Sequence, residues 1–253
     1  MIVGPTASGK TGVAIEIAQE IERRAQAVCG GALDGAKGAE IISADSRAIY
    51  RGMDIGTAKP NAEEQLAARH WGVDLVNPGE RFTVADWKEY AEAKIQEIKG
   101  RDKIPMVVGG TGLYVDALVY DYGFTDTAKL KKTDRNEICA NYLMIGVKTE
   151  PEKLRQRIEQ RADKMFNDEL YVETRRLVQM YNWDTQAMKS NIYQYVWKYL
   201  EGEYDLDTAK RLCALDDWHL AKRQMTWFKR NRTIKWLPLA EIKQYVIKCI
   251  QDV

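Results

Sequence analysis

Apolar and polar positions alternate with two different periods along the first half of the chain. Short apolar runs at residues 1–3, 40–45 and 105–110 are expected to form buried strands. Longer stretches between them, at about 11–27 and 84–99, repeat apolar residues at helical spacing. Strands that alternate with helices need crossover connections, so we expect parallel strands in one sheet with helices on both faces.

The second half of the chain is expected to be mostly helical. An apolar run at residues 142–147 predicts one more buried strand, and Pro151 suits the first position of a helix. Residues 154–181 are expected to form one long amphipathic helix or a pair of helices, and a last helix is predicted at about 207–229. A short edge strand should follow and end at Pro238.

Composition narrows the class of protein. The chain of 253 residues has four cysteines without a CxxC pair and two histidines, so we expect neither a disulfide framework nor a zinc site. The absence of a leader-like segment and of a membrane-length apolar run predicts a cytoplasmic protein without a membrane partner. A net charge of +1 argues against a strongly basic nucleic-acid binder, although it can hide a local basic surface. We expect a monomer.

The stretch GPTASGKT, residues 4–11, fits the pattern GxxxxGK[ST] between a strand and a helix. In this pattern backbone N–H groups turn towards an anion, Lys10 adds a charge for terminal phosphates, and Thr11 offers a hydroxyl to Mg²⁺. The expected phosphate-binding residues are Gly4, Pro5, Thr6, Ala7, Ser8, Gly9, Lys10 and Thr11. The pattern does not say which molecule carries the phosphates, and a glycine-rich helix cap without a ligand is the alternative.

With the strand pattern, this loop predicts an α/β fold of the P-loop NTPase type. We expect a three-layer arrangement in which helices flank a parallel sheet, followed by a helical C-terminal part. Residues 1–253 are expected to form a single P-loop core domain.

Polar residues follow two of the predicted strands. Asp45 ends one of them, and Gly109, Gly110 and Thr111 end another. Ligands of open α/β folds bind where the carboxyl ends of parallel strands meet. Asp45 is therefore a candidate general base, or alternatively a carboxylate that binds Mg²⁺ through water. Other polar residues in the intervening loops are expected to be solvated or to cap helices; they are Asp54, Lys59, His70, Asp74 and Asp86.

Seven segments along the chain carry a distinctive combination of motifs. They are GPTASGKT (4–11), IISADS (41–46), YRGMDIGTAKP (50–60), FTVADW (82–87), VVGGTGLY (107–114), YLEGE (199–203) and AKRQMTWFKR (221–230). In this order they resemble the tRNA dimethylallyltransferases, also called tRNA isopentenyltransferases. The resemblance implies transfer of a dimethylallyl group from dimethylallyl diphosphate to the N6 amine of an adenosine beside a tRNA anticodon. The phosphate loop would then hold the diphosphate of the prenyl donor.

The resemblance also implies roles for single residues. Asp45 and Thr111 would be the catalytic residues, Asp45 as the base for the adenine amine and Thr111 in contact with the target nucleotide. The leaving diphosphate would be stabilised by the loop, by Lys10 and by Mg²⁺ on Thr11. The adenine would have to leave the anticodon stack. The residues expected to contact the tRNA anticodon stem-loop are Asp45, Ser46, Arg47, Ala48, Thr111, Lys222 and Arg223.

A basic stretch near the C-terminus is a candidate RNA-binding segment. Its cations are interleaved with Trp227 and Phe228, and no acidic residue lies among them, which suits phosphate contact. The alternative is that the aromatic side chains anchor the helix in the core and only the cations meet solvent. These cations are Lys222, Arg223, Lys229, Arg230 and Arg232.

The chain departs from the family pattern near the expected diphosphate. Gln194 stands where the family usually has a cation, and Asp217 and Trp218 stand where it has a Thr-Arg pair. Loss of positive charge beside a leaving diphosphate is expected to lower the rate by orders of magnitude unless other cations compensate. The candidates for compensation are Arg47, Lys189 and Lys198.

Two further departures concern larger parts of the chain. Residues 123–141 are a short remnant in place of a helical insertion that grips the anticodon arm in the family, and the first strand, residues 1–3, is short. Three functions stay open: an active or slow tRNA prenyltransferase, a non-catalytic homologue that binds tRNA or another partner, and a P-loop kinase or NTPase for a small molecule.

Overall fold

A sheet of six parallel strands forms the centre of the part of the chain that the structure describes. In this computed structural model that part comprises residues 1–27, 35–124, 142–189 and 191–252. The strand order is β3-β2-β4-β1-β5-β6, and each neighbouring pair is parallel. The strands are β1 (Ile2–Val3), β2 (Ala39–Ala44), β3 (His70–Trp71), β4 (Ile104–Gly109), β5 (Ile145–Lys148) and β6 (Lys235–Pro238).

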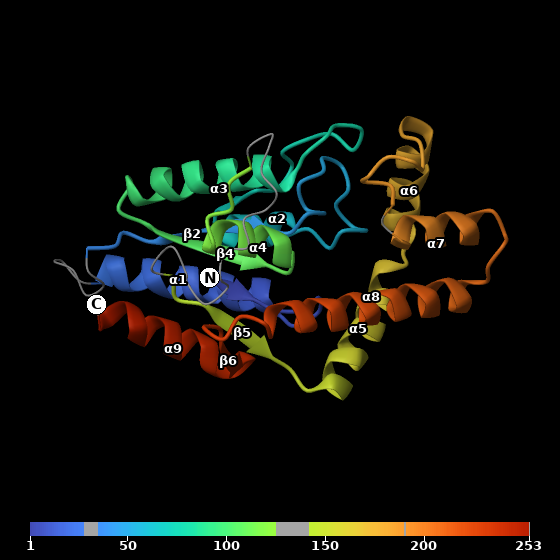
Figure 1. The fold of residues 1–253 in the computed structure, drawn as a ribbon. Coiled ribbons are helices and arrows are strands. Elements are labelled where there is room, and N and C mark those ends of the chain that lie inside the picture. The colour runs from blue at the N-terminus through green and yellow to red at the C-terminus, as the bar shows by residue number, and fades with distance from the viewer. Residues whose placement is uncertain (28–34, 125–141, 190, 253) are drawn as a thin grey trace.

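Helices cover both faces of the sheet. The described helices are α1 (Lys10–Ala27), α2 (Ala62–Ala67), α3 (Val84–Lys99), α4 (Gly112–Val119), α5 (Pro151–Met165), α6 (Asp168–Met180), α7 (Asn191–Leu200), α8 (Leu206–Phe228) and α9 (Leu239–Gln251). Figure 1 shows α3 and α4 on one side of the sheet and α1 and α9 on the other. The predicted three-layer architecture of the P-loop NTPase type is confirmed.

A second group of helices lies beyond one end of the sheet (Figure 1). Helices α6, α7 and α8 share a core around Leu170, Tyr193 and Val196. Ile49 and Met53, from the segment after β2, are buried in the same core. This contact ties the helical group to the carboxyl edge of the sheet, where the predicted site lies.

The hydrophobic pattern locates many of these elements. The predicted strands and the expected edge strand are present, and residues 154–181 form the pair α5 and α6. The chain divides there because the side chain of Asn167 caps α6 by accepting the Leu170 N–H at 3.0 Å. The pattern does not predict β3, α2, α4, α7 or α9. For α4 the reason is burial of almost every side chain, which removes the helical period.

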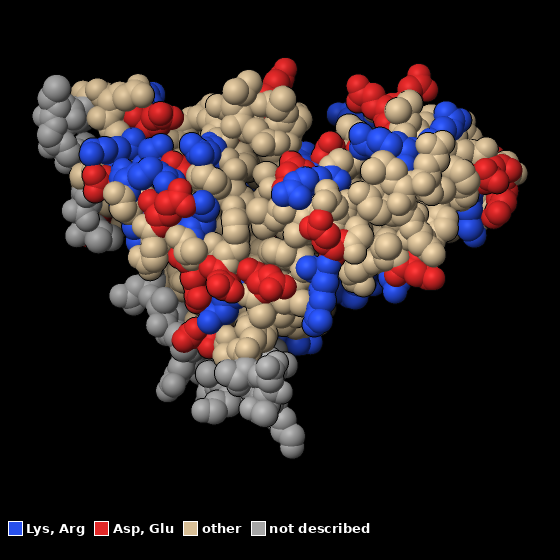
Figure 2. Space-filling model, turned by 90° about the horizontal axis from the view of Figure 1, so that it is seen from above, with Lys and Arg blue, Asp and Glu red and all other residues tan. Residues whose placement is uncertain are grey.

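Three expectations from the sequence concern membrane spans, disulfides and metal sites. Among the described helices none is long and apolar enough to cross a membrane. Cys213 and Cys249 are free, and the described ranges hold no group of three His, Cys, Asp or Glu side chains suited to a metal. The remnant expected at 123–141 lies outside the described residues apart from Gly123 and Phe124. Over the face in Figure 2, basic and acidic side chains are interspersed, in agreement with the balanced net charge.

Candidate active site

The phosphate loop lies at the carboxyl edge of the sheet, between β1 and α1. Its turn uses two positions with positive φ, Ala7 at 59° and Gly9 at 89°. A Cβ at Gly9 would lie 2.9 Å from a methyl group of Leu239, so glycine also allows close packing there. The Thr6 N–H donates to Oε1 of Gln224 at 2.8 Å, which brings α8 against the loop. The turn and the start of α1 together have the geometry of an anion site.

A cavity of about 690 Å³ opens in front of this loop. The predicted site residues that line it are Thr6, Ala7, Gly9, Lys10, Thr11, Asp45, Ser46, Arg47, Ala48, Thr111 and Arg223. Gly4, Pro5 and Ser8 do not line it and are buried within the loop. Lys222 is exposed, with its ammonium 5.8 Å from the centre of the Trp218 ring. The fold thus brings the loop, Asp45 and Thr111 to one cavity.

Lys10 is the charged group of the loop. Its Nζ donates to the carbonyl oxygen of Pro5 at 3.3 Å. Burial lowers the pKa of Lys10 to about 8; the carboxylate of Asp45 opposes this shift, and the positive charge of Arg161 adds to it. An anion in the cavity would raise this pKa, so binding of phosphate and protonation of Lys10 are coupled.

Asp45 and Thr111 are fixed by hydrogen bonds at the ends of β2 and β4. One carboxylate oxygen of Asp45 accepts the N–H of Arg47 at 2.8 Å, which orients the side chain. The Thr111 hydroxyl accepts the N–H of Ser46 at 2.9 Å, and the Thr111 N–H donates to the carbonyl oxygen of Ala44 at 3.0 Å. Hydrogen bonds to the residues on either side of Asp45 therefore link the two predicted catalytic residues.

The proposed compensating cations differ in their surroundings. Nη1 of Arg47 donates to the carbonyl oxygens of Gln186 at 2.9 Å and Ala187 at 3.4 Å, so this guanidinium joins the sheet edge to the segment before α7. Lys189 lines the cavity and is exposed. Lys198 does not line it; its ammonium lies over the Tyr204 ring at 5.1 Å.

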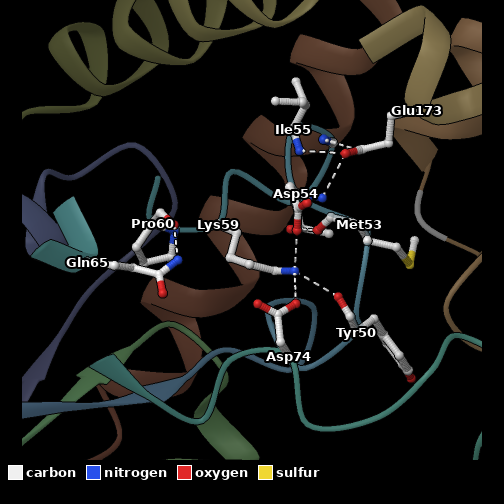
Figure 3. A network of polar contacts seen from close by, with 12 residues as sticks. Tyr50, Met53, Asp54, Ile55, Lys59, Pro60, Gln65, Asp74 and Glu173 are labelled. Carbon is white, nitrogen blue, oxygen red and sulfur yellow. Dashed lines mark hydrogen bonds and ion pairs between the residues drawn. The ribbon is translucent and has the colours of Figure 1, made fainter. Parts of the chain in front are cut away.

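The segment after β2 contains a buried lysine (Figure 3). The Lys59 side chain is only 2% exposed, and its ammonium donates to the carboxylates of Asp54 at 2.5 Å and Asp74 at 2.6 Å and to the carbonyl oxygen of Tyr50 at 2.8 Å. The prediction of a solvated role for Lys59 is therefore wrong. A lysine in a polar loop is expected to be exposed to solvent. Here the loop folds back over the Lys59 side chain and buries it.

Glu173 of α6 holds the same segment from the other side. Its carboxylate accepts the N–H groups of Asp54 at 2.8 Å and of Ile55 and Gly56 at 3.0 Å. It also accepts the hydroxyl of Tyr193 at 2.8 Å. Burial and the negative charge of Glu173 raise the pKa of Tyr193 well above its usual value, so the phenol stays protonated and donates. Gly56 lines the cavity, so Glu173 fixes part of the cavity wall.

The helix α8 closes the cavity opposite the sheet. Gln224 bridges two loops, because its Oε1 binds the phosphate loop and its Nε2 donates to the Gly110 carbonyl at 3.0 Å. Trp227 donates from Nε1 to Asp116 at 3.0 Å, and Phe228 is buried. Both aromatic side chains pack against the core, as the anchoring alternative predicts, and Trp227 in addition lines the cavity. The basic residues beside them are all exposed: Lys222, Arg223, Lys229, Arg230 and Arg232.

One of the residues that depart from the family pattern, Asp217, has a partner of opposite charge in the structure. Asp217 forms an ion pair with Arg161 of α5 at 2.5 Å, and both side chains line the cavity. Gln194 and Trp218 do not line it. Arg161, Glu173 and Gln224 are the residues that the sequence reasoning missed as parts of the site. Of these three residues, only Gln224 could have been found from the sequence, because it belongs to the AKRQ segment that carries the family resemblance.

The oxygen donors in the cavity fit Mg²⁺ better than a softer metal. The Thr11 hydroxyl and the Asp45 carboxylate line the same space, and Mg²⁺ prefers such ligands. Because no three His, Cys, Asp or Glu side chains of the described residues come together to hold a metal, phosphate oxygens and water would complete its coordination, which is usual for Mg²⁺ at phosphate sites.

Comparison with known proteins gives one consistent result. The family model described as IPP transferase matches residues 48–139 and 125–231. A tRNA dimethylallyltransferase of Acetivibrio thermocellus is 36% identical over 94% of this chain and 90% of its own. A relative with the same name from Alkaliphilus metalliredigens is 33% identical over 95% of this chain and 91% of its own.

Solved structures of similar fold carry names of the same kind as these relatives. The tRNA isopentenylpyrophosphate transferase of Bacillus halodurans superposes with a TM-score of 0.82 at 29% identity and covers 99% of this chain and 96% of its own. A eukaryotic dimethylallyltransferase acting on tRNA is 18% identical and shares the fold with a TM-score of 0.75 over 96% of this chain. The motifs, the fold and the relatives coincide, and the chain belongs to the IPP transferase family.

Proposed function

We propose that this protein transfers the dimethylallyl group of dimethylallyl diphosphate to N6 of an adenosine next to the anticodon of tRNA. One observation carries the proposal: the phosphate loop, Asp45 and Thr111 line a single cavity between the sheet edge and α8. A donor diphosphate and an acceptor base can therefore meet there. The names of the relatives favour this activity over that of a kinase.

The donor end of the cavity suits a diphosphate. The N–H groups of the turn and the ammonium of Lys10 would bind its oxygens. Mg²⁺ held by Thr11 would neutralise charge on the leaving group. The lowered pKa of Lys10 rises when the anion enters, so the lysine is charged in the complex.

The acceptor end suits an adenine amine. The N6 nitrogen attacks C1 of the dimethylallyl group, a C–N bond forms, and the C–O bond to diphosphate breaks. Asp45 takes the proton that the amine loses, and the electron pair of the C–O bond leaves with the diphosphate. Ser46, Arg47, Ala48 and Thr111 frame the base after it leaves the anticodon stack.

The RNA surface would extend from this cavity along α8. Arg223 lines the cavity, and Lys222 precedes it on the same helix. Both are exposed and available to phosphates of an anticodon stem-loop. Because tRNA is the proposed substrate, we place the protein in the cytoplasm.

We also propose that residues 1–253 form one P-loop core domain in which 123–141 replace the family's helical insertion. Two observations support this. The family model matches two segments that overlap at residues 125–139. The match to the Acetivibrio relative extends over 298 residues, more than this chain has. Contacts to the anticodon arm would then fall on the core and on α8.

The test is transfer by the purified protein. Dimethylallyl diphosphate, Mg²⁺ and an anticodon stem-loop with adenosines are incubated with the protein, and prenylated adenosine is measured by mass spectrometry. We expect product with Mg²⁺, none after chelation, and a loss of at least about 100-fold in Asp45→Asn. No product from the folded protein, or an ATP hydrolysis activity that dimethylallyl diphosphate does not inhibit, would overturn the proposal.

A further inference from the structure

Two leucines at the mouth of the cavity keep much of their surface in solvent. Leu113 of α4 is 39% exposed and Leu220 of α8 is 38% exposed, and both line the cavity. The two helices pack against each other so closely that a Cβ on Gly112 would overlap the indole of Trp227. Single exposed leucines are ordinary on a protein surface, but two on the walls of one binding cavity indicate a ligand with apolar faces.

Both leucines lie beside the place proposed for the target nucleotide. Leu113 is two positions after Thr111. Leu220 lies one helical turn before Gln224, which donates to the carbonyl oxygen of Gly110 at 3.0 Å, next to Thr111. The leucines therefore border the region in which an adenine would enter the cavity, one from the start of α4 and one from α8.

Positive charge accompanies the leucines at the mouth. Arg223 and Lys189 are exposed and line the cavity. Arg223 is three positions after Leu220 and so lies on the same side of α8. Cations position the phosphates of a nucleic acid, whereas apolar side chains cover or separate its bases. A mouth that offers both kinds of group suits an RNA loop, in which unpaired bases and phosphates lie close together.

We propose that Leu113 and Leu220 are positioning residues that pack against the bases on either side of the target adenosine after it has left the anticodon stack. This proposal rests on the proposed function. A base that leaves the stack exposes the apolar faces of its two neighbours to water, which is unfavourable. Leucine side chains that cover those faces stabilise the unstacked state of the RNA. They take no part in the transfer of the proton or of the dimethylallyl group.

The test compares two anticodon stem-loops as substrates of the full chain. One is intact, and the other has abasic nucleotides on both sides of the target adenosine, so that the leucines have no base to cover. We expect kcat/KM of Leu113→Ala and of Leu220→Ala to be about 10-fold below wild type on the intact loop. On the abasic loop both variants should lie within about twofold of wild type, because the interaction is absent there for all three proteins.

Matched variants separate apolar contact from other effects. Leu215→Ala removes a leucine of α8 that is 42% exposed and does not line the cavity, and it should match wild type on both loops. Leu113→Met keeps an apolar side chain and should retain most of the rate, whereas Leu113→Asn has a similar size and should behave like Leu113→Ala. Circular dichroism melting verifies that each variant is folded.

The outcomes distinguish this proposal from the proposed function. Cavity variants as fast as Leu215→Ala on the intact loop would overturn the role of the leucines. An equal loss on both loops would also overturn it, since the leucines would then act through the shape of the site and not through the neighbouring bases. In both cases transfer by the wild type leaves the proposed function standing. A folded wild-type protein that transfers to neither loop overturns both proposals.

Discussion

The hydroxyl of Thr111 is joined twice to Ser46. It accepts the Ser46 N–H at 2.9 Å and donates to the Ser46 hydroxyl at 3.2 Å. These bonds tie the start of α4 to the residues that follow β2. Since Asp45 precedes Ser46 and is itself fixed to the Arg47 N–H, the position of the proposed base depends on Thr111.

Replacement of Thr111 should therefore affect both catalysis and stability. Thr111→Val removes both bonds, and Thr111→Ser keeps them. Each hydrogen bond contributes about 1 kcal/mol, so we expect kcat to fall about 10-fold to 100-fold in the valine variant and little in the serine variant. Because the same two bonds also stabilise the folded chain, the melting temperature should fall by a few degrees in the valine variant and little in the serine variant. Equal kcat values for the two variants would contradict a role of this hydroxyl.

The pKa of Lys10 predicts how pyrophosphate binding depends on pH. Burial lowers it from the usual 10.5 to about 8, so the free protein loses this proton as the pH rises through about 8. Because the neutral amine binds an anion less well, affinity for pyrophosphate should fall over the interval from about pH 7.5 to pH 9. Calorimetric titrations at several pH values measure this decline.

Two variants separate Lys10 from the titration of pyrophosphate itself. Lys10→Met should bind weakly and keep only the pH dependence of the ligand. Lys10→Arg keeps its charge throughout this range and should show the same shallow dependence. A wild-type profile that matches the profile of Lys10→Met would argue against titration of this lysine.

Lys59 should matter for stability. Lys59→Met removes two charge-assisted hydrogen bonds and one to a carbonyl, and it leaves the carboxylates of Asp54 and Asp74, about half exposed, without their cation. We expect a loss of about 2 kcal/mol in the free energy of unfolding in urea. The matched control is Lys37→Met, which breaks an exposed pair with Asp102 and should cost less than about 0.5 kcal/mol.

Glu173 should couple stability to the shape of the cavity. Glu173→Gln replaces an acceptor oxygen with an NH₂ group that faces backbone donors, so we expect about 3 kcal/mol of lost stability. Since the segment it holds lines the cavity, the KM for dimethylallyl diphosphate should also rise several-fold. Glu169→Gln, exposed on the same helix, is the control and should change neither quantity. A normal KM in Glu173→Gln would mean that the cavity wall does not depend on this carboxylate.

Those parts of the site that are brought together by the strand topology can be predicted from the sequence. Asp45 and Thr111 follow neighbouring strands, and the carboxyl ends of parallel strands must share an edge of the sheet. The phosphate loop is likewise a local pattern, with its glycines and its lysine at fixed spacing. Such features need no knowledge of how distant helices pack.

The remaining parts depend on packing that no local pattern contains. Arg161 meets Asp217 across 56 positions of sequence, and Glu173 binds amides 117 to 119 positions away. The solvated role predicted for Lys59 is wrong for the same reason, because burial of this lysine depends on Asp74 and on the path of the loop rather than on its neighbours in sequence. In each case the side chain looked like part of a solvated helix face or loop.

The first strand, although it has only two residues, is held on both sides. Ile2 pairs with Val108 and Ile145, and Val3 pairs with Gly109 and Gly146, in the buried middle of the sheet. Its amides can exchange with solvent only when a neighbouring strand moves away, so their protection should approach that of global unfolding. The phosphate loop thus begins from a point that fluctuates no more than the core does, on the timescale of minutes to hours that hydrogen exchange reports.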